Sequence, residues 1–193
     1  SNKSAIMKEC ETLFWDNSLE EKLDDNPYLL CFNNGIFDFK TNVFRDGKPE
    51  DYVSKSIKYN YVPIEKFTTN QHEIVNEIQD FMEKVFPDEY LKKYMWEHAA
   101  STLIGTNRNQ TFNIYCGCGS NGKSMWVDLM GAALGCLKGT VPSTLITTKR
   151  VGIGQASSEI AQLKGLRYAC MNEPSKGDKI NEGVMKEITG GDP

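Results

Sequence analysis

The alternation of apolar and polar residues predicts a β-hairpin around the Asn34–Gly35 pair. Apolar and aromatic residues fill 28–32 and 36–39 on either side of this pair, which favours a tight turn between two strands. Residues 57–61 then alternate between large apolar and polar side chains, so a further half-buried strand is expected, ended by Pro63. The first third of the chain therefore predicts a small sheet.

A spacing of three to four residues between apolar positions predicts helices in other parts of the chain. This spacing covers residues 6–14, 70–84 and 88–104, and Pro87 and Gly105 supply the stops. The first of these helices is expected to be scaffold. His98 lies on or beside the apolar face of the last one and is expected to be a core or rim residue rather than a ligand.

The segment from Thr111 to Gly135 organises the chain. Its start, at 112–115, is apolar and suited to a buried strand, and residues 125–134 show helical spacing until Gly135. Between them, residues 117–124 read G-C-G-S-N-G-K-S and fit the phosphate-binding pattern G-x-x-x-x-G-K-S/T. We call this octet the P-loop. Strand, glycine loop and helix follow one another in the order that nucleotide binding requires.

The residue types of the P-loop match the chemistry of a bound triphosphate. Its glycines let the backbone turn tightly and bring successive N–H groups around a phosphate, and the helix start adds its positive dipole end. Lys123 is expected to reach the β and γ phosphates, and the Ser124 hydroxyl to bind the Mg²⁺ that accompanies ATP. The predicted nucleotide ligands are Gly117, Cys118, Gly119, Ser120, Asn121, Gly122, Lys123 and Ser124.

Other interpretations of the same glycines fit less well. A dinucleotide site needs an acidic residue about 20 positions further on, and none lies between Asp128 and Glu159. Downstream H-R-D and D-F-G signatures of a protein kinase are missing, as is the N-K-x-D motif of a GTPase. A glycine turn with a chance Lys-Ser pair remains as the plain alternative.

A second carboxylate-bearing strand is expected between Leu166 and Glu173. The run is largely apolar and delivers Glu173 at its carboxyl end, the edge at which α/β sheets bind ligands. We therefore predict that Glu173 orients the attacking water and, with Ser124, binds the metal. Asn172 stands where many P-loop enzymes have a metal-binding Asp, which weakens the metal contact or shifts it to Glu173. The alternative for Glu173 is a structural salt bridge.

Composition narrows the class of protein without naming a partner. No apolar run is long enough for a membrane span, so a cytoplasmic protein without membrane contact is expected. Six cysteines without a C-x-x-C pair, and only two histidines, favour reduced thiols over a metal site. Residues 1–100 hold 12 Lys and Arg against 19 Asp and Glu, and residues 101–193 hold 10 against 7. The second half of the chain is therefore more suited than the first to bind a polyanion.

Two further groups of residues leave alternatives open. The aromatic residues of the predicted sheet would either stack on bases or pack the inner face of the sheet, and packing is favoured because the neighbourhood is acidic. Lys149 and Arg150 lie in a glycine-flanked loop that would contact DNA or a neighbouring subunit, or form a solvated turn. The aromatic residues are Phe32, Phe37, Phe39, Tyr59 and Tyr61.

Three motifs in order give the chain a family resemblance. They are G-x-G-x-N-G-K-S at 117–124, the strand ending in Glu173, and the run M-K-E-I-T-G-G-D at 185–192. Together they resemble the superfamily 3 helicases, in particular the phage and large-DNA-virus primase-helicases that include the poxvirus-type NTPase. The N-terminal segment 26–38 is similar to the domain that precedes the helicase in that branch.

This resemblance implies a fold and an assembly. The expected fold is α/β: a P-loop NTPase of AAA+ type, with a three-layer, mostly parallel sheet truncated at its C-terminus, preceded by a small α+β module. Residues 1–90 would form the N-terminal module and 91–193 the incomplete ATPase core. The family works as a ring, usually a hexamer, that moves along single-stranded DNA, with a primase or replication factor as a further partner.

The resemblance also implies roles and limits. Lys123 and Ser124 would bind phosphate and metal, Glu173 would polarise water, and Lys186 and Asp192 would lie where nucleotide state is coupled to DNA. The third motif and the arginine finger are expected after Pro193, so weak ATP hydrolysis is expected from residues 1–193 alone. A small-molecule kinase and a nucleotide-responsive docking module are the alternatives.

Overall fold

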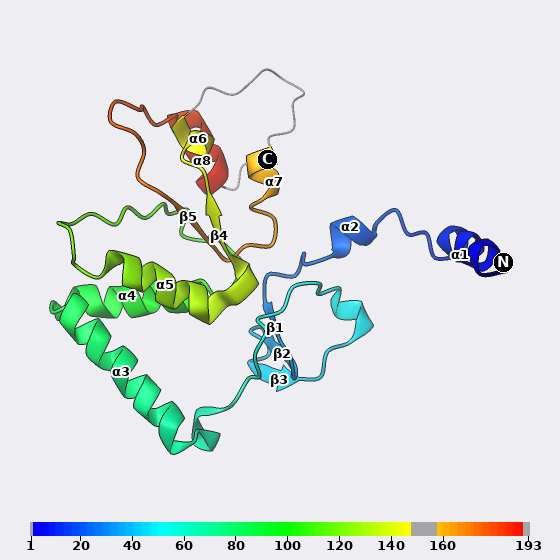
Figure 1. The fold of residues 1–193 in the computed structure, drawn as a ribbon, viewed down its shortest axis with the longest axis horizontal. Coiled ribbons are helices and arrows are strands. Elements are labelled where there is room, and N and C mark those ends of the chain that lie inside the picture. The colour runs from blue at the N-terminus through cyan, green and yellow to red at the C-terminus, as the bar shows by residue number, and fades with distance from the viewer. Residues whose placement is uncertain (1, 148–157, 191–193) are drawn as a thin grey trace.

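The computed structural model describes residues 2–147 and 158–190, which form two small sheets with helices around them (Figure 1). The first sheet is antiparallel in the order β1–β2–β3, and the second pairs β4 with β5 in parallel. The strands are β1 (Leu29–Phe32), β2 (Gly35–Asp38), β3 (Val43–Arg45), β4 (Lys138–Val141) and β5 (Tyr168–Met171). The α-helices are α1 (Asn2–Leu13), α2 (Leu19–Lys22), α3 (Thr69–Val85), α4 (Glu89–Ser101), α5 (Lys123–Leu134), α6 (Thr144–Thr147), α7 (Ser158–Ala161) and α8 (Glu182–Gly190). Short 3-10 turns lie at Pro49–Asp51, Ile64–Lys66 and Gly135–Leu137.

The predicted hairpin is confirmed as β1 and β2, with Phe32 opposite Gly35 across the turn. Gly35 has φ of +151°, and a Cβ at this position would lie 2.6 Å from the carbonyl oxygen of Arg45. The close passage of β3 therefore requires glycine here. The Asn34 side chain also pairs with the backbone of Tyr61, donating to its oxygen at 3.0 Å and accepting from its nitrogen at 2.8 Å.

The expected strand at 57–61 is wrong, because only Ile57 forms a β-bridge, with Phe32. The N–H of Ile57 donates to the carbonyl oxygen of Cys31, and the carbonyl oxygen of Tyr59 accepts from the N–H of Asn33. The backbone of Tyr61 instead bonds to the Asn34 side chain. The segment therefore leaves the sheet after one bridge. The sheet aromatics pack against one another, as the packing interpretation predicted; the ring centroids of Phe37 and Phe39, for example, lie 4.9 Å apart, and those of Phe32 and Tyr61 lie 5.3 Å apart.

The two long helices α3 and α4 confirm the expected spans. Thr68 caps α3 by accepting from the backbone N–H of Gln71, and the Gln71 side chain accepts in return from the Thr68 backbone, which completes a capping box. Asp88 caps α4 through the N–H of Leu91 at 2.8 Å. Both helix starts are therefore fixed by local side chains.

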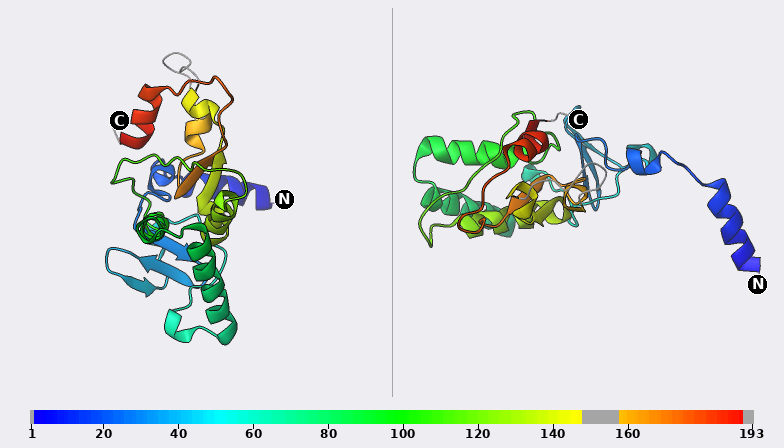
Figure 2. Two further views of the ribbon diagram at one scale, coloured as in Figure 1. Left: turned by 90° about the vertical axis from the view of Figure 1, so that its left-hand side faces the viewer. Right: turned by 90° about the horizontal axis from the view of Figure 1, so that it is seen from above.

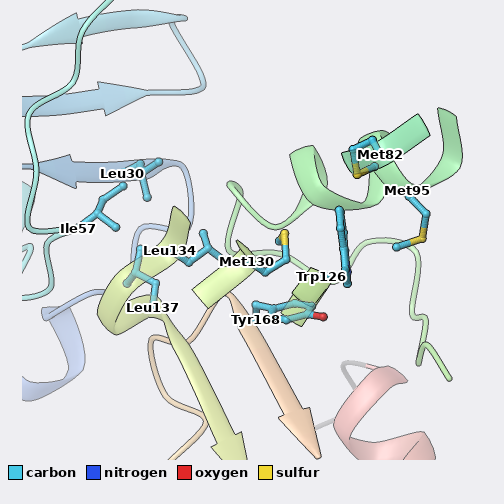
Figure 3. Packing of buried hydrophobic residues seen from close by; sticks show 9 residues of the cluster. All are labelled: Leu30, Ile57, Met82, Met95, Trp126, Met130, Leu134, Leu137 and Tyr168. Atoms are coloured by element: carbon cyan, nitrogen blue, oxygen red, sulfur yellow. The ribbon is translucent and has the colours of Figure 1, made fainter. Parts of the chain in front are cut away.

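One hydrophobic cluster connects the first sheet to the helices and to β5 (Figure 3). Trp126 and Leu134 of α5 are almost fully buried in it, and Trp126 meets Phe86 edge-on, with ring centroids 5.8 Å apart. Residues from both sides of the expected module boundary at 90/91 contribute, so the two parts share a core. The buried members are Leu30, Ile57, Met82, Met95, Trp126, Met130, Leu134, Leu137 and Tyr168. The boundary itself stays a prediction.

Arg167, directly before β5, connects this strand to the start of the first sheet and to the segment after α4. Its guanidinium donates to the carbonyl oxygens of Pro27 at 2.6 Å, Leu29 at 2.6 Å and Leu103 at 2.7 Å. Desolvation lowers the pKa of this guanidinium from its ordinary value. A Cβ on Gly105 would lie 3.2 Å from the guanidinium carbon, so a larger residue at this position would crowd the Arg167 side chain. We call this set of contacts the Arg167 clamp.

The expected large parallel sheet is not present in the described residues, although the α/β class is confirmed. The parallel sheet there has two strands, β4 and β5, and residues 112–115 form no strand. A strand exists only where its backbone pairs with a neighbour, and residues 2–147 and 158–190 offer none to this segment. Phe112 and Ile114 are accordingly exposed instead of buried.

Helix α1 forms as its periodicity predicts, but its apolar side chains face solvent. In Figure 1 and in the right-hand view of Figure 2 it stands away from the other elements at the end of an extended segment. Ile6 is 58% exposed and Leu13 is 73% exposed. The molecule exposes 14312 Å², whereas a compact monomer of its mass would expose about 9,300 Å². The fold is therefore open, and α1 adds no packing to the core.

Candidate nucleotide-binding site

The P-loop joins the extended segment 111–116 to helix α5, which begins at Lys123. Gly122 directly precedes the helix and has φ of +83°, in the left-handed region. A Cβ at this position would lie 2.6 Å from a Val85 methyl carbon at the end of α3. Glycine is therefore required twice, by the backbone conformation and by the close approach of α3. Ser120 also adopts a positive φ, of 57°, which is uncommon for a residue with a side chain.

The loop is tight at its first glycine and open in its middle. A Cβ on Gly117 would lie 2.0 Å from the Asn121 side-chain nitrogen, whereas a Cβ on Gly119 would meet nothing within 4 Å. The Asn121 carboxamide therefore folds back across the start of the loop. Space remains above Gly119, where a ligand would approach the backbone.

The ammonium of Lys123 is held by three acceptors of the loop itself. It donates to the carbonyl oxygens of Gly117 at 2.9 Å and Cys118 at 3.1 Å, and to Oδ1 of Asn121 at 2.8 Å. An ammonium has three N–H groups, so each finds a partner. The positive charge is thereby kept over the loop, where a phosphate would take over these hydrogen bonds.

Ser124 and Glu173 are both exposed and free to bind a ligand. Neither side chain forms a hydrogen bond or ion pair with residues 2–147 or 158–190, so the salt-bridge alternative for Glu173 finds no partner there. Glu173 follows β5 by two residues, at the edge where the parallel strands β4 and β5 end. Within the described chain, no hydrogen bond or ion pair joins it to the P-loop. The assignment of both residues to nucleotide and metal stays a prediction.

A metal ion at the P-loop would be coordinated by hydroxyl, carboxylate and phosphate oxygens. Across the described ranges, no three His, Cys, Asp or Glu side chains gather into a metal-binding cluster. The six cysteines, which all lie in the described part of the chain, form no disulfide with one another. Oxygen ligands from Ser124 and Glu173, completed by phosphates, suit Mg²⁺, which commonly uses few protein ligands.

Other predicted residues lie elsewhere. Lys186 is exposed on α8, which packs on α6 through a second apolar cluster around Val141 and Ile146. Lys149, Arg150 and Asp192 lie outside the described residues. His98 is half-buried and contacts the Tyr115 hydroxyl at 2.7 Å, which confirms its expected place at the core.

Sequence reasoning missed three contacts that support the site. Asn121 bonds to Lys123 in addition to its predicted place in the nucleotide site, and the sequence patterns above do not predict the contacts of Arg167 or the hydroxyl contact between Tyr115 and Tyr168. A signal existed for Arg167, because a single arginine opens an otherwise apolar strand. Nothing local marks the tyrosine contact, since 53 residues separate its partners.

Comparison with known families matches the first part of the chain. The model for "D5 N terminal like" proteins covers residues 1–106, which include α1 to α4 and the first sheet. The chain belongs to the D5 N terminal like family. The primase-helicase resemblance expected from the motifs agrees with this membership.

Relatives of this D5-family chain come from large DNA viruses. A candidate helicase, L207/L206, of Acanthamoeba polyphaga mimivirus is 37% identical over 190 residues, which are 98% of this chain and 19% of the relative. A candidate helicase, 121R, of Invertebrate iridescent virus 3 is 33% identical over 193 residues, 100% of this chain and 20% of the relative. A candidate primase, C962R, of African swine fever virus is 24% identical over 195 residues, 97% of this chain and 19% of the relative.

The D5-family chain thus spans about a fifth of the length of these relatives. The matches extend across nearly the whole chain, so they include the P-loop as well as the N-terminal module. Within residues 2–147 and 158–190, no helix combines the length and the apolar character that a bilayer crossing requires.

Proposed function

We propose that this chain is part of an ATP-dependent DNA helicase that serves the replication of a large DNA virus. In this proposal the P-loop binds ATP with Mg²⁺, and hydrolysis drives movement along single-stranded DNA. The proposal also places the protein in the cytoplasm of a host cell, at the site of viral replication. The names of the viral relatives support the replication role, and the chemistry of the P-loop supports the nucleotide.

The observation that carries this proposal is the position of the Lys123 ammonium over the P-loop, at the start of α5. The helix start and the loop N–H groups favour a phosphate there, and Lys123 adds a full positive charge. Ser124 would hold the Mg²⁺, and Glu173 would orient the attacking water and share the metal. Because phosphoryl transfer depends on positioning and charge stabilisation, each of these groups would contribute to the rate, together with an arginine finger expected beyond residue 193.

In the finer fold that we propose, of AAA+ P-loop type, residues 112–115 are the strand that leads into the P-loop. Their apolar and aromatic side chains suit a buried strand, and their backbone pairs with no strand among residues 2–147 and 158–190. A further strand beside them would supply the missing hydrogen bonds and would cover Ile114, which is 68% exposed.

We also propose assembly into a ring, with a hexamer as the expected form. The large exposed area and the isolated helix α1 offer surface for neighbouring subunits. DNA would contact the second half of the chain, which carries the excess of basic residues and the exposed Lys186.

The test is ATPase activity of the full-length protein, measured with and without single-stranded DNA. DNA-stimulated hydrolysis is expected, and Lys123→Ala and Glu173→Gln are each expected to abolish it. Hydrolysis that survives both substitutions would refute the proposed site.

A docking module for a primase or another replication factor is the second candidate function. The exposed apolar side chains of Phe14 and Trp15 next to α1 favour it, since large exposed apolar groups mark interaction surfaces. Nucleotide binding without DNA-stimulated turnover in the full-length protein would support this function over the helicase.

A further inference from the structure

Two tyrosine hydroxyls connect residues 112–115, which we call the lead-in of the P-loop, to β5. Tyr168, the first residue of β5, is buried and donates to the hydroxyl of Tyr115 at 3.1 Å. Tyr115 lies two residues before Gly117, the first residue of the P-loop. Glu173 follows on the chain five residues after Tyr168. The contact therefore joins the two segments that carry the proposed catalytic groups.

Helix α4 holds the same lead-in at two points. The hydroxyl of Tyr115 lies 2.7 Å from Nε2 of His98, and the hydroxyl of Tyr94 donates to Oδ1 of Asn113 at 2.9 Å. The rings of Tyr94 and His98 stack nearly parallel, 8° apart. Tyrosine and histidine side chains from α4 thus reach both Asn113 and Tyr115.

The hydrogens of this chain of contacts can be assigned consistently. Tyr168 donates to Tyr115, so the proton of Tyr115 is available for Nε2 of His98, which accepts when the imidazole is neutral. Burial lowers the pKa of His98 and favours this neutral form. Burial and the contact with Tyr115 raise the pKa of Tyr168, which keeps its hydroxyl protonated.

These side-chain contacts matter because the lead-in has no strand partner among the described residues. In a paired strand, backbone hydrogen bonds would fix the position of residues 112–115 relative to β5. Here the bonds of Asn113 and Tyr115 hold the segment in place. Among the described residues, the tyrosine pair is therefore the hydrogen bond that joins this segment directly to β5.

We propose that Tyr115 and Tyr168 are positioning residues for ATP hydrolysis: their hydroxyl pair sets the placement of the P-loop relative to the strand that delivers Glu173. This inference rests on the proposed ATPase function. Neither tyrosine belongs to the P-loop, so their loss leaves the groups that bind the phosphates in place. It misplaces the attacking water relative to the terminal phosphate, and a misplacement of about 1 Å lowers a rate by about 100-fold.

The experiment measures kcat and KM for ATP on the full-length protein with Tyr115→Phe, Tyr168→Phe and the double substitution. Each single variant is expected to lower kcat about tenfold or more and to change KM less than about threefold. The double variant is expected to be no slower than the slower single variant, because both remove the same contact. Tyr59→Phe is the matched control: the Tyr59 hydroxyl donates to the carbonyl oxygen of Ala133, at the other end of α5, and its loss should leave kcat unchanged.

Three outcomes overturn the inference. Single variants with unchanged kcat would make the contact merely structural, even if thermal unfolding shows a loss of stability. Losses that multiply in the double variant would mean that the tyrosines act separately. A wild-type protein without ATPase activity would remove the proposed function and this inference with it, and that result is recognised before any variant is made.

Discussion

Oδ1 of Asn121 lies 2.8 Å from the ammonium of Lys123, so an uncharged side chain of the P-loop holds the residue that is proposed to bind phosphate. The same carboxamide closes over Gly117, where no side chain would fit. A triphosphate that enters the loop must therefore replace Asn121 as a partner of Lys123. Asn121 and Lys123 act as one unit, and substitutions at each should differ in a predictable way.

Lys123→Ala should weaken ATP binding by about tenfold to a hundredfold, because hydrogen bonds to a charged group contribute about 1.5–3 kcal/mol. Titration with a fluorescent ATP analogue measures this change. Lys176→Ala removes another lysine, exposed on the segment that precedes α8, and serves as the control with unchanged affinity. Equal affinities in the wild type and Lys123→Ala would show that ATP binds elsewhere or not at all.

Asn121→Asp should weaken ATP binding more than Asn121→Ala does. The new carboxylate would form an ion pair with Lys123 in the free protein and would repel the phosphates in the complex. Alanine leaves Lys123 the carbonyl oxygens of Gly117 and Cys118 and adds no charge. The gap between the two variants should shrink at high salt, because the repulsion is screened. Identical affinities at low salt would contradict this account.

Arg167→Met should destabilise the protein by about 2–4 kcal/mol, because the partly buried carbonyl oxygens of Leu29 and Leu103 lose the guanidinium donor, whereas that of Pro27 keeps the backbone N–H of Gly105. Arg167→Lys should recover little of this loss, since an ammonium cannot reproduce the planar fork of the guanidinium. Urea unfolding measures both. Arg108→Met is the control: Arg108 is exposed and contacts Tyr28, so a change within about 0.5 kcal/mol is expected. Equal losses at 108 and 167 would refute the clamp.

Trp126→Ala should cost about 3–5 kcal/mol, because it empties a nearly fully buried site in the main core. Trp126→Phe should cost less than Trp126→Ala, because the cavity that it leaves is smaller. Phenylalanine keeps a ring facing Phe86, and it removes an indole N–H that has no hydrogen-bond partner within the described part of the chain. Thermal or urea unfolding distinguishes the two variants. A phenylalanine variant as unstable as the alanine variant would show that the indole nitrogen is satisfied after all.

His98 should make the protein less stable as the pH falls below about 6.5. Burial lowers the pKa of His98 in the folded protein below its ordinary value of 6.5. The unfolded chain therefore takes up a proton that the folded chain resists, and stability is lost from about pH 6.5 down to the lowered pKa. Above that range His98 contributes no pH dependence. Free energies of unfolding between pH 7.5 and 5.5 should thus fall less in His98→Gln than in the wild type, and parallel curves would contradict the prediction.

Elements that depend on neighbouring residues could be predicted from the sequence. The Asn34–Gly35 pair specifies its own turn, and the stop at Gly135 follows from a left-handed φ of +53° that glycine adopts easily. The helix start at Lys123 could be predicted for the same reason, since the glycines before it act within eight residues; the binding of phosphate there stays a prediction. Membership of a primase-helicase family also followed from the order of short motifs.

Features that depend on distant partners could not be predicted. Residues 112–115 have the composition of a strand, but composition does not supply a neighbour to pair with. Residues 57–61 also alternate as a strand would, yet the Asn34 side chain forms hydrogen bonds with the backbone nitrogen and oxygen of Tyr61. The strand pairing ends there. The partners of Arg167 are 64 to 140 residues away, so its role emerges only from the folded chain.

The Arg167 clamp also sets an order of events during synthesis. The acceptors at Pro27, Leu29 and Leu103 leave the ribosome long before their donor. A nascent chain that ends at residue 140 has the first sheet and the long helices, but it lacks both Arg167 and the buried ring of Tyr168. The N-terminal part of the polypeptide therefore cannot complete its packing until residues 167 and 168 have been synthesised, and until then it exposes apolar surface that chaperones recognise.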